Sequence, residues 1–281
     1  MEIRINDQKL DFALDKEKII GEVLAALEQW ISESSHILSG LSIDGESISS
    51  SMIETALSKE IADVKCLDLY TNPVSELAAS SLVNLLDDIK GFEKCSFEEK
   101  GNFFYAWKES PCGMFLFHHM GELFMLCENT FLHGNITPSV LYSITEERLR
   151  EVNTPTDELA KLEPLINEIC ERLVDLPLDI QTGKDARAAQ TIQVFSSVTE
   201  KLFRVFRQLD IQGYLSQSAD GKQLAEDINK FGDIIKELFQ AFEKQDTVLV
   251  GDLAEYEAAV RLKELYLSII NNCRQTAQDA K

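Results

Sequence analysis

The feature that most constrains the fold of this chain is the spacing of its apolar residues between positions 155 and 260. Leucine, isoleucine, valine and phenylalanine recur there every three or four residues, which is the period of an amphipathic α-helix. The residues form four runs, bounded by Leu159 and Leu176, Phe195 and Leu209, Leu224 and Phe242, and Leu249 and Val260. With short connections, these runs predict an antiparallel helical bundle over residues 154–281.

Prolines, glycines and one aspartate indicate where these helices end. Pro177, Gly213, Gly221 and Asp246 stand between the runs or at their edges, so we expect the connections there. Pro164 lies inside the first run. Because proline lacks an N–H donor and clashes with the preceding turn, we expect a kink or a restarted helix at that position.

Two of the runs resemble each other at an offset of 36 residues. Residues Phe195–Asp210 align with Phe231–Asp246, with Phe, Leu, Phe, Phe and Asp at equivalent places. A duplication and convergent packing onto one core both explain this similarity, and two copies do not define a solenoid.

The same alignment indicates a wide apolar face. Phe203 and Phe239 lie beside the main stripe of their helices, close to Phe206 and Phe242. A face wider than a bundle needs is covered either by a partner or by another part of the same chain. We take Phe203, Phe206, Phe239 and Phe242 as candidate partner-binding residues.

The first 71 residues have a different pattern. Met1, Ile3 and Ile5 alternate with polar residues, a turn follows at Asn6–Lys9, and Leu10, Phe12 and Leu14 alternate again. A helix over 17–32, capped near Asp15, carries an apolar stripe with Trp30 at its edge. Later strands are expected at Leu41–Ile43, at Ile48 after the turn Asp44–Gly45, and at Val64–Tyr70.

This ββαββ order resembles the ubiquitin-like β-grasp fold over residues 1–71, a quarter of the chain. The resemblance implies a module that contacts other proteins. Modifiers and sulfur carriers of this fold act through a free C-terminal Gly-Gly. Here the chain continues into Thr71-Asn72-Pro73, so the resemblance does not extend to modifier chemistry.

Residues 72–153 form a third part, which is aromatic-rich and mainly helical. Asn72 and Pro73 are typical of a helix start, and the apolar stripe that follows ends at Gly91. Residues 92–135 hold eight of the fifteen phenylalanines, and helical and alternating spacings compete there. The break at Asn135–Pro138 is a candidate hinge. The sequence thus predicts an α+β protein with parts at 1–71, 72–153 and 154–281.

Region 103–133 contains most of the side chains that could bind a metal ion or take part in catalysis. Cys112 and His118, and then Cys127 and His133, share a Cys-x5-His spacing that offers either zinc ligands or a thiol–imidazole pair. Structural zinc loops usually use shorter spacings, and no orienting group or oxyanion hole is apparent. We therefore expect buried thiols and partly exposed imidazoles, with no catalytic, cofactor-binding or metal-binding residues. The aromatic segment Phe103–Trp107 is expected in a core, with a ligand groove as the alternative.

Other charged groups favour structural roles. We expect the start of the last helix to be a solvent-exposed acidic end, capped by Asp252, Glu255 and Glu257. Lys201, Arg204 and Arg207 favour an ordinary solvated helix surface over a local basic face. Thr182–Asp185 lacks the glycine and Ser/Thr of a phosphate-binding loop, and the bundle contains no histidine for a di-iron centre.

Charge and cysteine content limit the classes of partner. The chain has 27 Lys and Arg against 48 Asp and Glu, a net charge of −21, so we expect no nucleic-acid partner. The most hydrophobic stretch, Met114–Leu132, holds two histidines and two glutamates, so we expect no membrane insertion. Six scattered cysteines and a start without an apolar leader favour reduced thiols and the cytoplasm.

These observations predict a non-catalytic protein–protein interaction or adaptor protein that binds another protein, of basic character, through its helical region. A homodimer is a subsidiary expectation. Two alternatives stay open: an acidic helical chaperone for assembly or secretion, and an enzyme or metal protein that uses residues 103–133.

Overall fold

The computed structural model describes residues 1–12, 16–49, 52–215 and 219–279. Its contacts divide the chain into two compact units, Met1–Ile136 and Thr137–Lys281, and the boundary falls at the break expected near residues 135–138. Each unit is described by itself. The three-part division of the sequence stays a prediction; the contacts group the helix before residue 154 with the C-terminal helices.

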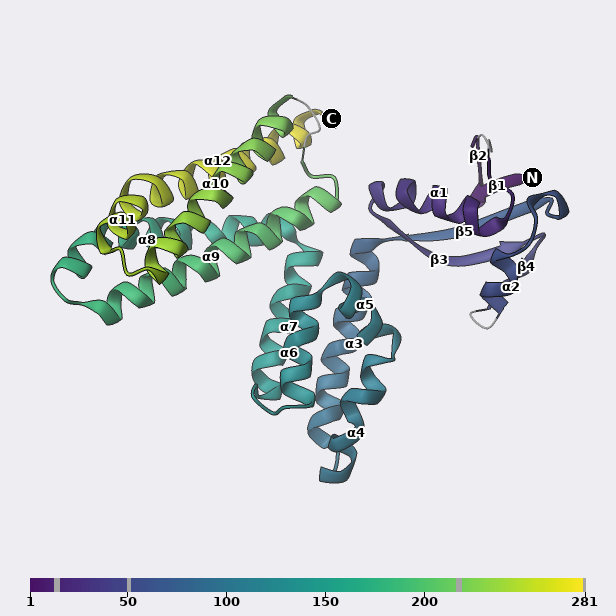
Figure 1. The fold of residues 1–281 in the computed structure, drawn as a ribbon, viewed down its shortest axis with the longest axis horizontal. Helices are drawn as coiled ribbons and strands as arrows, with labels where there is room; N and C mark the ends of the chain where they lie inside the picture. The colour runs from purple at the N-terminus through teal and green to yellow at the C-terminus, as the bar shows by residue number, and fades with distance from the viewer. Residues whose placement is uncertain (13–15, 50–51, 216–218, 280–281) are drawn as a thin grey trace. The chain divides into compact units, whose positions relative to one another are not determined.

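The first unit begins with a small mixed sheet of five strands in the order β2-β1-β5-β3-β4 (Figure 1). The central pair, β1 and β5, is parallel, whereas the other neighbours are antiparallel. The strands are β1 (Glu2–Ile5), β2 (Gln8–Leu10), β3 (His36–Ile43), β4 (Glu46–Ser47) and β5 (Cys66–Pro73). The helical segments around them are α1 (Ile20–Glu33), α2 (Ile53–Leu57) and the 3-10 turn η2 (Ile61–Asp63).

The pattern of buried residues follows the predicted alternation and helical stripe. Ile3, Leu67 and Leu69 are buried on the inner face of the sheet, and the stripe from Ile20 to Ile31 of α1 covers them. Trp30 lies beside this stripe and is half exposed, as its position at the edge predicted. Strand residue Leu14 and the expected helix cap Asp15 lie outside the described residues.

One asparagine fixes the first hairpin to the centre of the sheet. Asn6 occupies the turn between β1 and β2 with a φ of 48°. Its side-chain amide donates a hydrogen bond to the Thr71 carbonyl (3.0 Å), and its Oδ1 accepts one from the Thr71 amide (2.9 Å). The turn is therefore tied to β5 as well as to its own hairpin.

The rest of the first unit is helical. It consists of α3 (Val74–Lys94), α4 (Phe97–Lys108), α5 (Pro111–His119) and α6 (Gly121–Phe131). The predicted boundaries of α3 need two corrections. Asn72 pairs with β3 and does not cap the helix; Pro73, at the end of β5, is the N-cap residue, so the helix starts one residue later than predicted. Gly91 does not end the helix, because Phe92 in the next turn is buried on the same stripe as Ile89.

The ambiguous segment 92–135 folds around stacked aromatic rings. Phe92, Phe103 and Phe131 lie with ring centroids about 5 Å apart, at 4.9 to 5.1 Å. Trp107 stacks on Phe124 at 5.7 Å. This aromatic cluster confirms the core expected for the segment Phe103–Trp107 in its buried members, whereas Tyr105 is half exposed.

A tight helix connection needs a glycine between α4 and α5. A Cβ atom on Gly113 would lie 2.4 Å from the Trp107 carbonyl oxygen and 2.7 Å from the Lys108 Cα. Real Cβ atoms do not approach backbone so closely. Gly113 therefore allows the start of α5 to pack directly against the end of α4.

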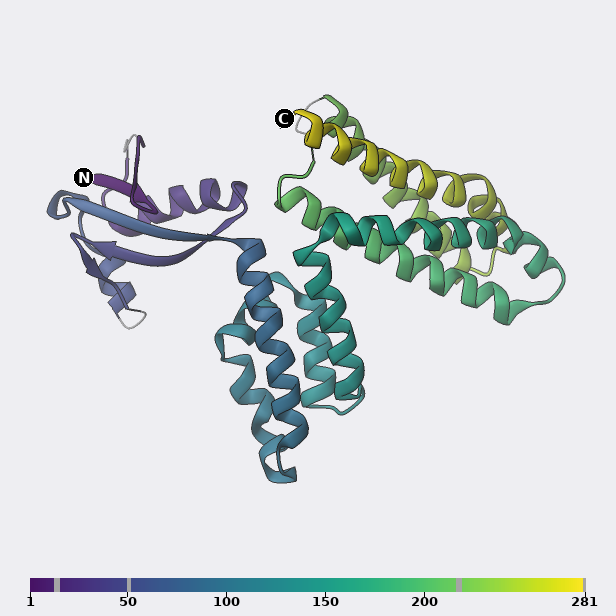
Figure 2. The ribbon, with the colours of Figure 1, turned by 180° about the vertical axis from the view of Figure 1, so that it is seen from behind.

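The second unit is a bundle of long helices, as the periodicity predicted (Figures 1 and 2). Helix α8 packs on both α9 and α12, and α10 packs on α12. The helices are α7 (Pro138–Asn153), α8 (Pro155–Gln181), α9 (Asp185–Ile211), α10 (Ala219–Glu243), α11 (Thr247–Asp252) and α12 (Ala259–Asp279).

Two details of the bundle differ from expectation. Helix α8 runs through both Pro164 and Pro177, so neither proline restarts or ends it. Pro177 instead packs against Gly251 of α11, where an added Cβ would lie 3.2 Å from the proline ring.

Between α11 and α12 the chain makes one π-helical turn, Leu253–Ala258. The Asp246 side chain caps α11 by accepting a hydrogen bond from the Leu249 amide (3.1 Å).

Each part has its own buried core. In the bundle this core runs from Leu159 on α8 to Ile269 on α12, and in the sheet module it lies between the sheet and α1. Over the described part of the chain, no helix combines the length and the apolarity that crossing a bilayer requires.

Candidate functional site

The structure places most of the candidate phenylalanine face inside the bundle. Phe203, Phe206 and Phe239 are partly buried and pack against the bundle core. Among the four, only Phe242 is exposed, at 40%. The partner-binding role of these four residues stays a prediction, and Phe242 is the most accessible of them.

The internal similarity has a packing explanation. Phe195 of α9 and Phe231 of α10, which are equivalent in the alignment, are both buried and meet edge to face at 6.3 Å. Phe203 reaches the same Phe231 ring at 6.2 Å. Large rings therefore fill the space between α9 and α10, and packing explains why Phe195 and Phe231 occupy equivalent positions.

Region 103–133 does not bring its reactive side chains together. Cys112 and Cys127 are buried in the helical core, whereas His118 and His133 are exposed. Among the residues that the structure describes, no group of three His, Cys, Asp or Glu side chains is placed to hold a metal ion. Burial raises the pKa of Cys112 to about 12 and that of Cys127 well above its ordinary value. Both thiols are therefore protonated at neutral pH and are poor nucleophiles.

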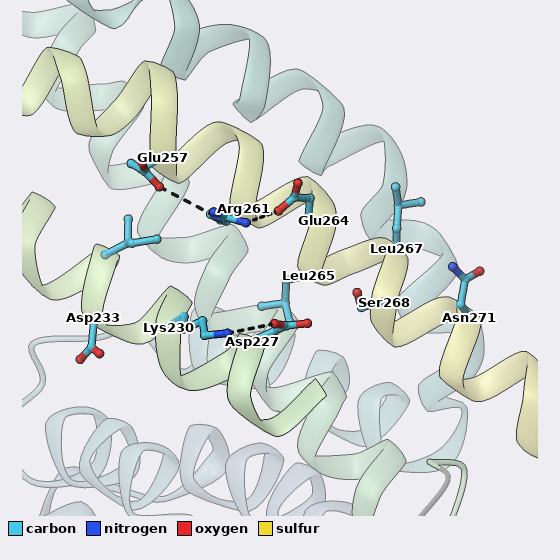
Figure 3. Close-up of a pocket in the computed structure, with 11 residues that line it drawn as sticks. Asp227, Lys230, Asp233, Glu257, Arg261, Glu264, Leu265, Leu267, Ser268 and Asn271 are labelled. Carbon is cyan, nitrogen blue, oxygen red and sulfur yellow. Dashed lines mark hydrogen bonds and ion pairs between the residues drawn. The ribbon is translucent and has the colours of Figure 1, made fainter. Parts of the chain in front are cut away.

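The bundle carries a groove between α10 and α12, with a volume of about 840 Å³ (Figure 3). Ile234, partly buried, and Leu265, 2% exposed, contribute its apolar lining. Leu267, which is 48% exposed, also lines it. We call this hollow the α10–α12 groove.

The walls of the α10–α12 groove carry the same order of charges. Asp227, Lys230 and Asp233 line it from α10, and Glu257, Arg261 and Glu264 line it from the π-turn and α12. Both cations pair within their own wall. Arg261 lies 2.8 Å from Glu264 and 3.8 Å from Glu257, and Lys230 lies 4.0 Å from Asp227 (Figure 3). Four carboxylates against two cations leave the groove acidic.

Sequence reasoning missed this groove because its polar residues looked like an ordinary solvated helix face. Of the acidic group Asp252, Glu255 and Glu257, only Glu257 lines it. Glu255 and Glu257 lie within the π-turn, and Asp252 precedes it without a side-chain cap hydrogen bond. A signal was present in the repeated acid–base–acid order of the two helices.

An apolar stripe continues beyond the groove on the same helix. Tyr256, Val260 and Leu267 are 64%, 46% and 48% exposed. Their spacing of four and seven residues places them along one line of the helix surface. The bundle thus leaves an apolar line beside an acidic groove.

Two of the three basic residues predicted on a solvated face of α9, Lys201 and Arg204, are held in ion pairs, which corrects the prediction for them. Lys201 lies 3.0 Å from Glu147 and 3.1 Å from Glu158, and Arg204 forms two hydrogen bonds with Glu151 (3.0 and 3.1 Å). These pairs join α7, α8 and α9. Arg207, in contrast, is exposed.

The ion pairs of this network shift the ionisation of its buried members. Burial alone would raise the pKa of the Glu158 carboxyl, but hydrogen bonds from Lys161 and Lys201 outweigh burial and hold that pKa below its ordinary value. Burial would lower the pKa of Lys201, but its contacts with Glu147 and Glu158 raise it. Burial raises the pKa of the Glu151 carboxyl to about 7. The network is a structural clamp that joins α7, α8 and α9.

A smaller hollow of about 330 Å³ lies in the sheet module. Its lining includes the half-exposed Trp30 of α1, Lys9 of β2 and His36 of β3. Ser34, whose hydroxyl oxygen lies 3.4 Å from the Nδ1 atom of His36, also lines it.

Comparisons with known proteins match two separate segments of the chain to family models. Residues 1–72 match a family model described as the TP0873 N-terminal domain, which ends within one residue of β5. Residues 157–267 match a model described as a domain of unknown function (DUF8042), which covers most of the bundle. An uncharacterized protein of Treponema pallidum (strain Nichols) is 22% identical over 272 residues, which span 96% of this chain and 97% of that protein. No solved structure matches the chain significantly.

Proposed function

We propose that this chain is a non-catalytic protein-binding protein of the adaptor type, which holds its partner through the C-terminal helical unit. The observation that carries the proposal is a set of large apolar side chains left exposed on that unit. Phe242, Tyr256, Val260 and Leu267 are each at least 40% exposed. Apolar residues gathered on helical faces are typical of sites that bind other proteins.

The sheet module supports an adaptor with a second contact surface. Its strand order, with a parallel central pair and one helix across the sheet, is consistent with the β-grasp resemblance. Strand β5 passes directly into α3. Within this proposal the module is a fused contact domain, with the half-exposed Trp30 on its surface.

Two observations support the non-catalytic part of the proposal and the cytoplasm as its compartment. The thiols of Cys112 and Cys127 are buried and protonated, and they act as small apolar core side chains. The imidazoles of His118 and His133 are exposed and apart from them. A reducing compartment suits a core built on free thiols.

The test is capture of a companion from the native cell, followed by reconstitution with purified proteins. The full chain is tagged as wild type, as Phe242→Ser with Tyr256→Ser, and as a control with Val174→Ser, an exposed position on α8. We expect the wild type and the control to retain a companion that the double variant loses. Titration calorimetry with the purified companion should then show saturable binding.

Other outcomes separate the alternatives. If the companion stays soluble only in the presence of this chain, the result would favour a chaperone function over an adaptor function. A companion that is a second copy would make the protein a homodimer. Absence of saturable binding by any purified companion would contradict the proposal.

A further inference from the structure

We infer that the α10–α12 groove binds a basic, amphipathic helix of a partner protein. The inference rests on the proposed function and adds to it a site and a class of ligand. Three features carry it: the dimensions of the groove, the charges of its walls and the apolar line at its edge.

The dimensions suit one helix. From Glu257 to Asn271 the wall on the π-turn and α12 is about 20 Å long at 1.5 Å per residue, enough for about 14 residues of a helical ligand. The partly buried Ile234 offers an apolar contact within the groove, above the buried Leu265. A helix that lies between two others packs its ridges into their grooves, and this is a common way of recognising helical segments.

The charges select a basic ligand. Each wall has one cation between two carboxylates, and each cation is paired within its own wall. Among the described residues, no ion pair crosses the groove from α10 to α12. The carboxylates of the two walls therefore share an acidic hollow with an excess of negative charge (Figure 3). A ligand with lysine or arginine along its flanks would neutralise both walls at once.

The apolar line gives the ligand a second contact. Leu267 belongs both to the groove lining and to the exposed stripe with Tyr256 and Val260. A ligand that was basic all round would leave this stripe uncovered. An amphipathic helix would place its apolar face on Leu267 and Val260 and its basic face toward the carboxylates.

Charge also argues against a second copy of this chain as the occupant. Two copies each carry a net charge of −21, so their approach is opposed by repulsion. Lys201 and Arg204, the cations on the inner side of α9, are already held by glutamates of α7 and α8. The occupant is therefore assigned to a different protein with a basic helix.

Designed peptides provide a direct test on the full chain. The probe is a fluorescent peptide of about 14 residues with leucine on one helical face and lysine on the other. One comparison peptide keeps the leucines and replaces lysine by glutamate, and another has the probe's composition in a scrambled, non-amphipathic order. Anisotropy titration should show tight binding of the probe and weak binding of both comparison peptides. The affinity for the probe should fall as the salt concentration is raised.

Variants locate the binding. Leu267→Glu places a charge on the apolar lining and should weaken binding at least about tenfold, which corresponds to about 1.4 kcal/mol. Asp233→Lys with Glu257→Lys should weaken it similarly and reduce its dependence on salt. The matched controls are Val174→Glu and Glu163→Lys, at exposed positions on α8, and they should leave the affinity unchanged. Circular dichroism checks that every variant keeps its helical content.

The outcomes separate this inference from the proposed function. If the controls weaken binding as much as the groove variants, or if the scrambled peptide binds equally well, attraction is non-specific and the groove is not the site. If the probe does not bind although a native companion does, the inference is wrong and the proposed function survives. If neither binds, both fail.

Discussion

At the scale of single residues, Glu158 shows how a buried charge is stabilised. Its carboxylate is 2% exposed and meets Lys161 at 2.7 Å and Lys201 at 3.1 Å. A carboxyl whose pKa is lower in the folded state stabilises the fold above the unfolded pKa, and this stabilisation is lost as the pH falls through the folded pKa. Glu158 thus contributes stability at neutral pH that acid removes.

The corresponding prediction concerns Glu158→Gln. At pH about 7 we expect the free energy of unfolding to fall by about 2 kcal/mol, because Lys201 keeps its partial burial with one partner fewer. At pH about 3 the difference should shrink, because the wild-type carboxyl is then increasingly protonated. Urea denaturation at the two pH values measures both. Glu163→Gln, exposed on the same helix, is the control, and equal stability of Glu158→Gln and wild type at neutral pH would contradict the prediction.

A second residue-scale prediction distinguishes the phenylalanines. Phe239→Ser should destabilise the chain by about 2 kcal/mol, because its ring packs on the bundle core. Phe242→Ser should change the stability by less than about 1 kcal/mol, because that ring is 40% exposed. Thermal denaturation compares the two. Equal destabilisation would show that Phe242 is also a core residue.

At the scale of elements, the sequence predicted what periodicity encodes and missed what depends on contacts. The stripes of α8, α9 and α10 were evident, because buried residues recur every three or four positions. The end of α3 was misplaced because glycine is a common helix stop, whereas the burial of Phe92 carries the helix onward. The α10–α12 groove was missed because the sequence of a polar helix face does not indicate which other helix lies opposite it.

Two glycines test these element boundaries. Gly91→Ala should stabilise the chain by about 0.5 to 1 kcal/mol, because Gly91 lies within α3 and an added Cβ meets no atom within 4 Å. Gly113→Ala should destabilise it by about 2 kcal/mol or more, because its Cβ would collide with the α4 backbone. Chemical denaturation measures both. Destabilisation by Gly91→Ala would place that residue at a left-handed helix end instead.

At the scale of the whole molecule, the sequence and the structure place the start of the C-terminal bundle at different residues. The sequence begins the bundle at residue 154, whereas the contacts include α7 from Pro138. The difference arises from pairs that no pattern reveals: Glu147 and Glu151 of α7 hold Lys201 and Arg204 of α9. Leu141 and Val152 of α7 are also buried.

Fragments distinguish these two limits. A fragment of residues 137–281 should fold alone, with helical circular dichroism and a cooperative thermal transition, because it contains the complete bundle core. A fragment of residues 154–281 should be less stable by about 3 kcal/mol or more, because Arg204 loses its carboxylate partner. Equal stability of the two fragments would make α7 dispensable to the bundle.

The π-turn between α11 and α12 has a consequence for how this chain tolerates changes in length. Such a turn holds one residue more than an α-helical turn while the helices on either side keep their facing. Loss of one residue within Leu253–Ala258 should therefore be absorbed by a return to α-helical pitch. The same loss at Lys263 would rotate the rest of α12 by about 100° and turn Leu265 and Ile269 outward. A variant with one residue deleted in the π-turn should thus keep its fold, whereas a variant with the deletion at Lys263 should lose stability.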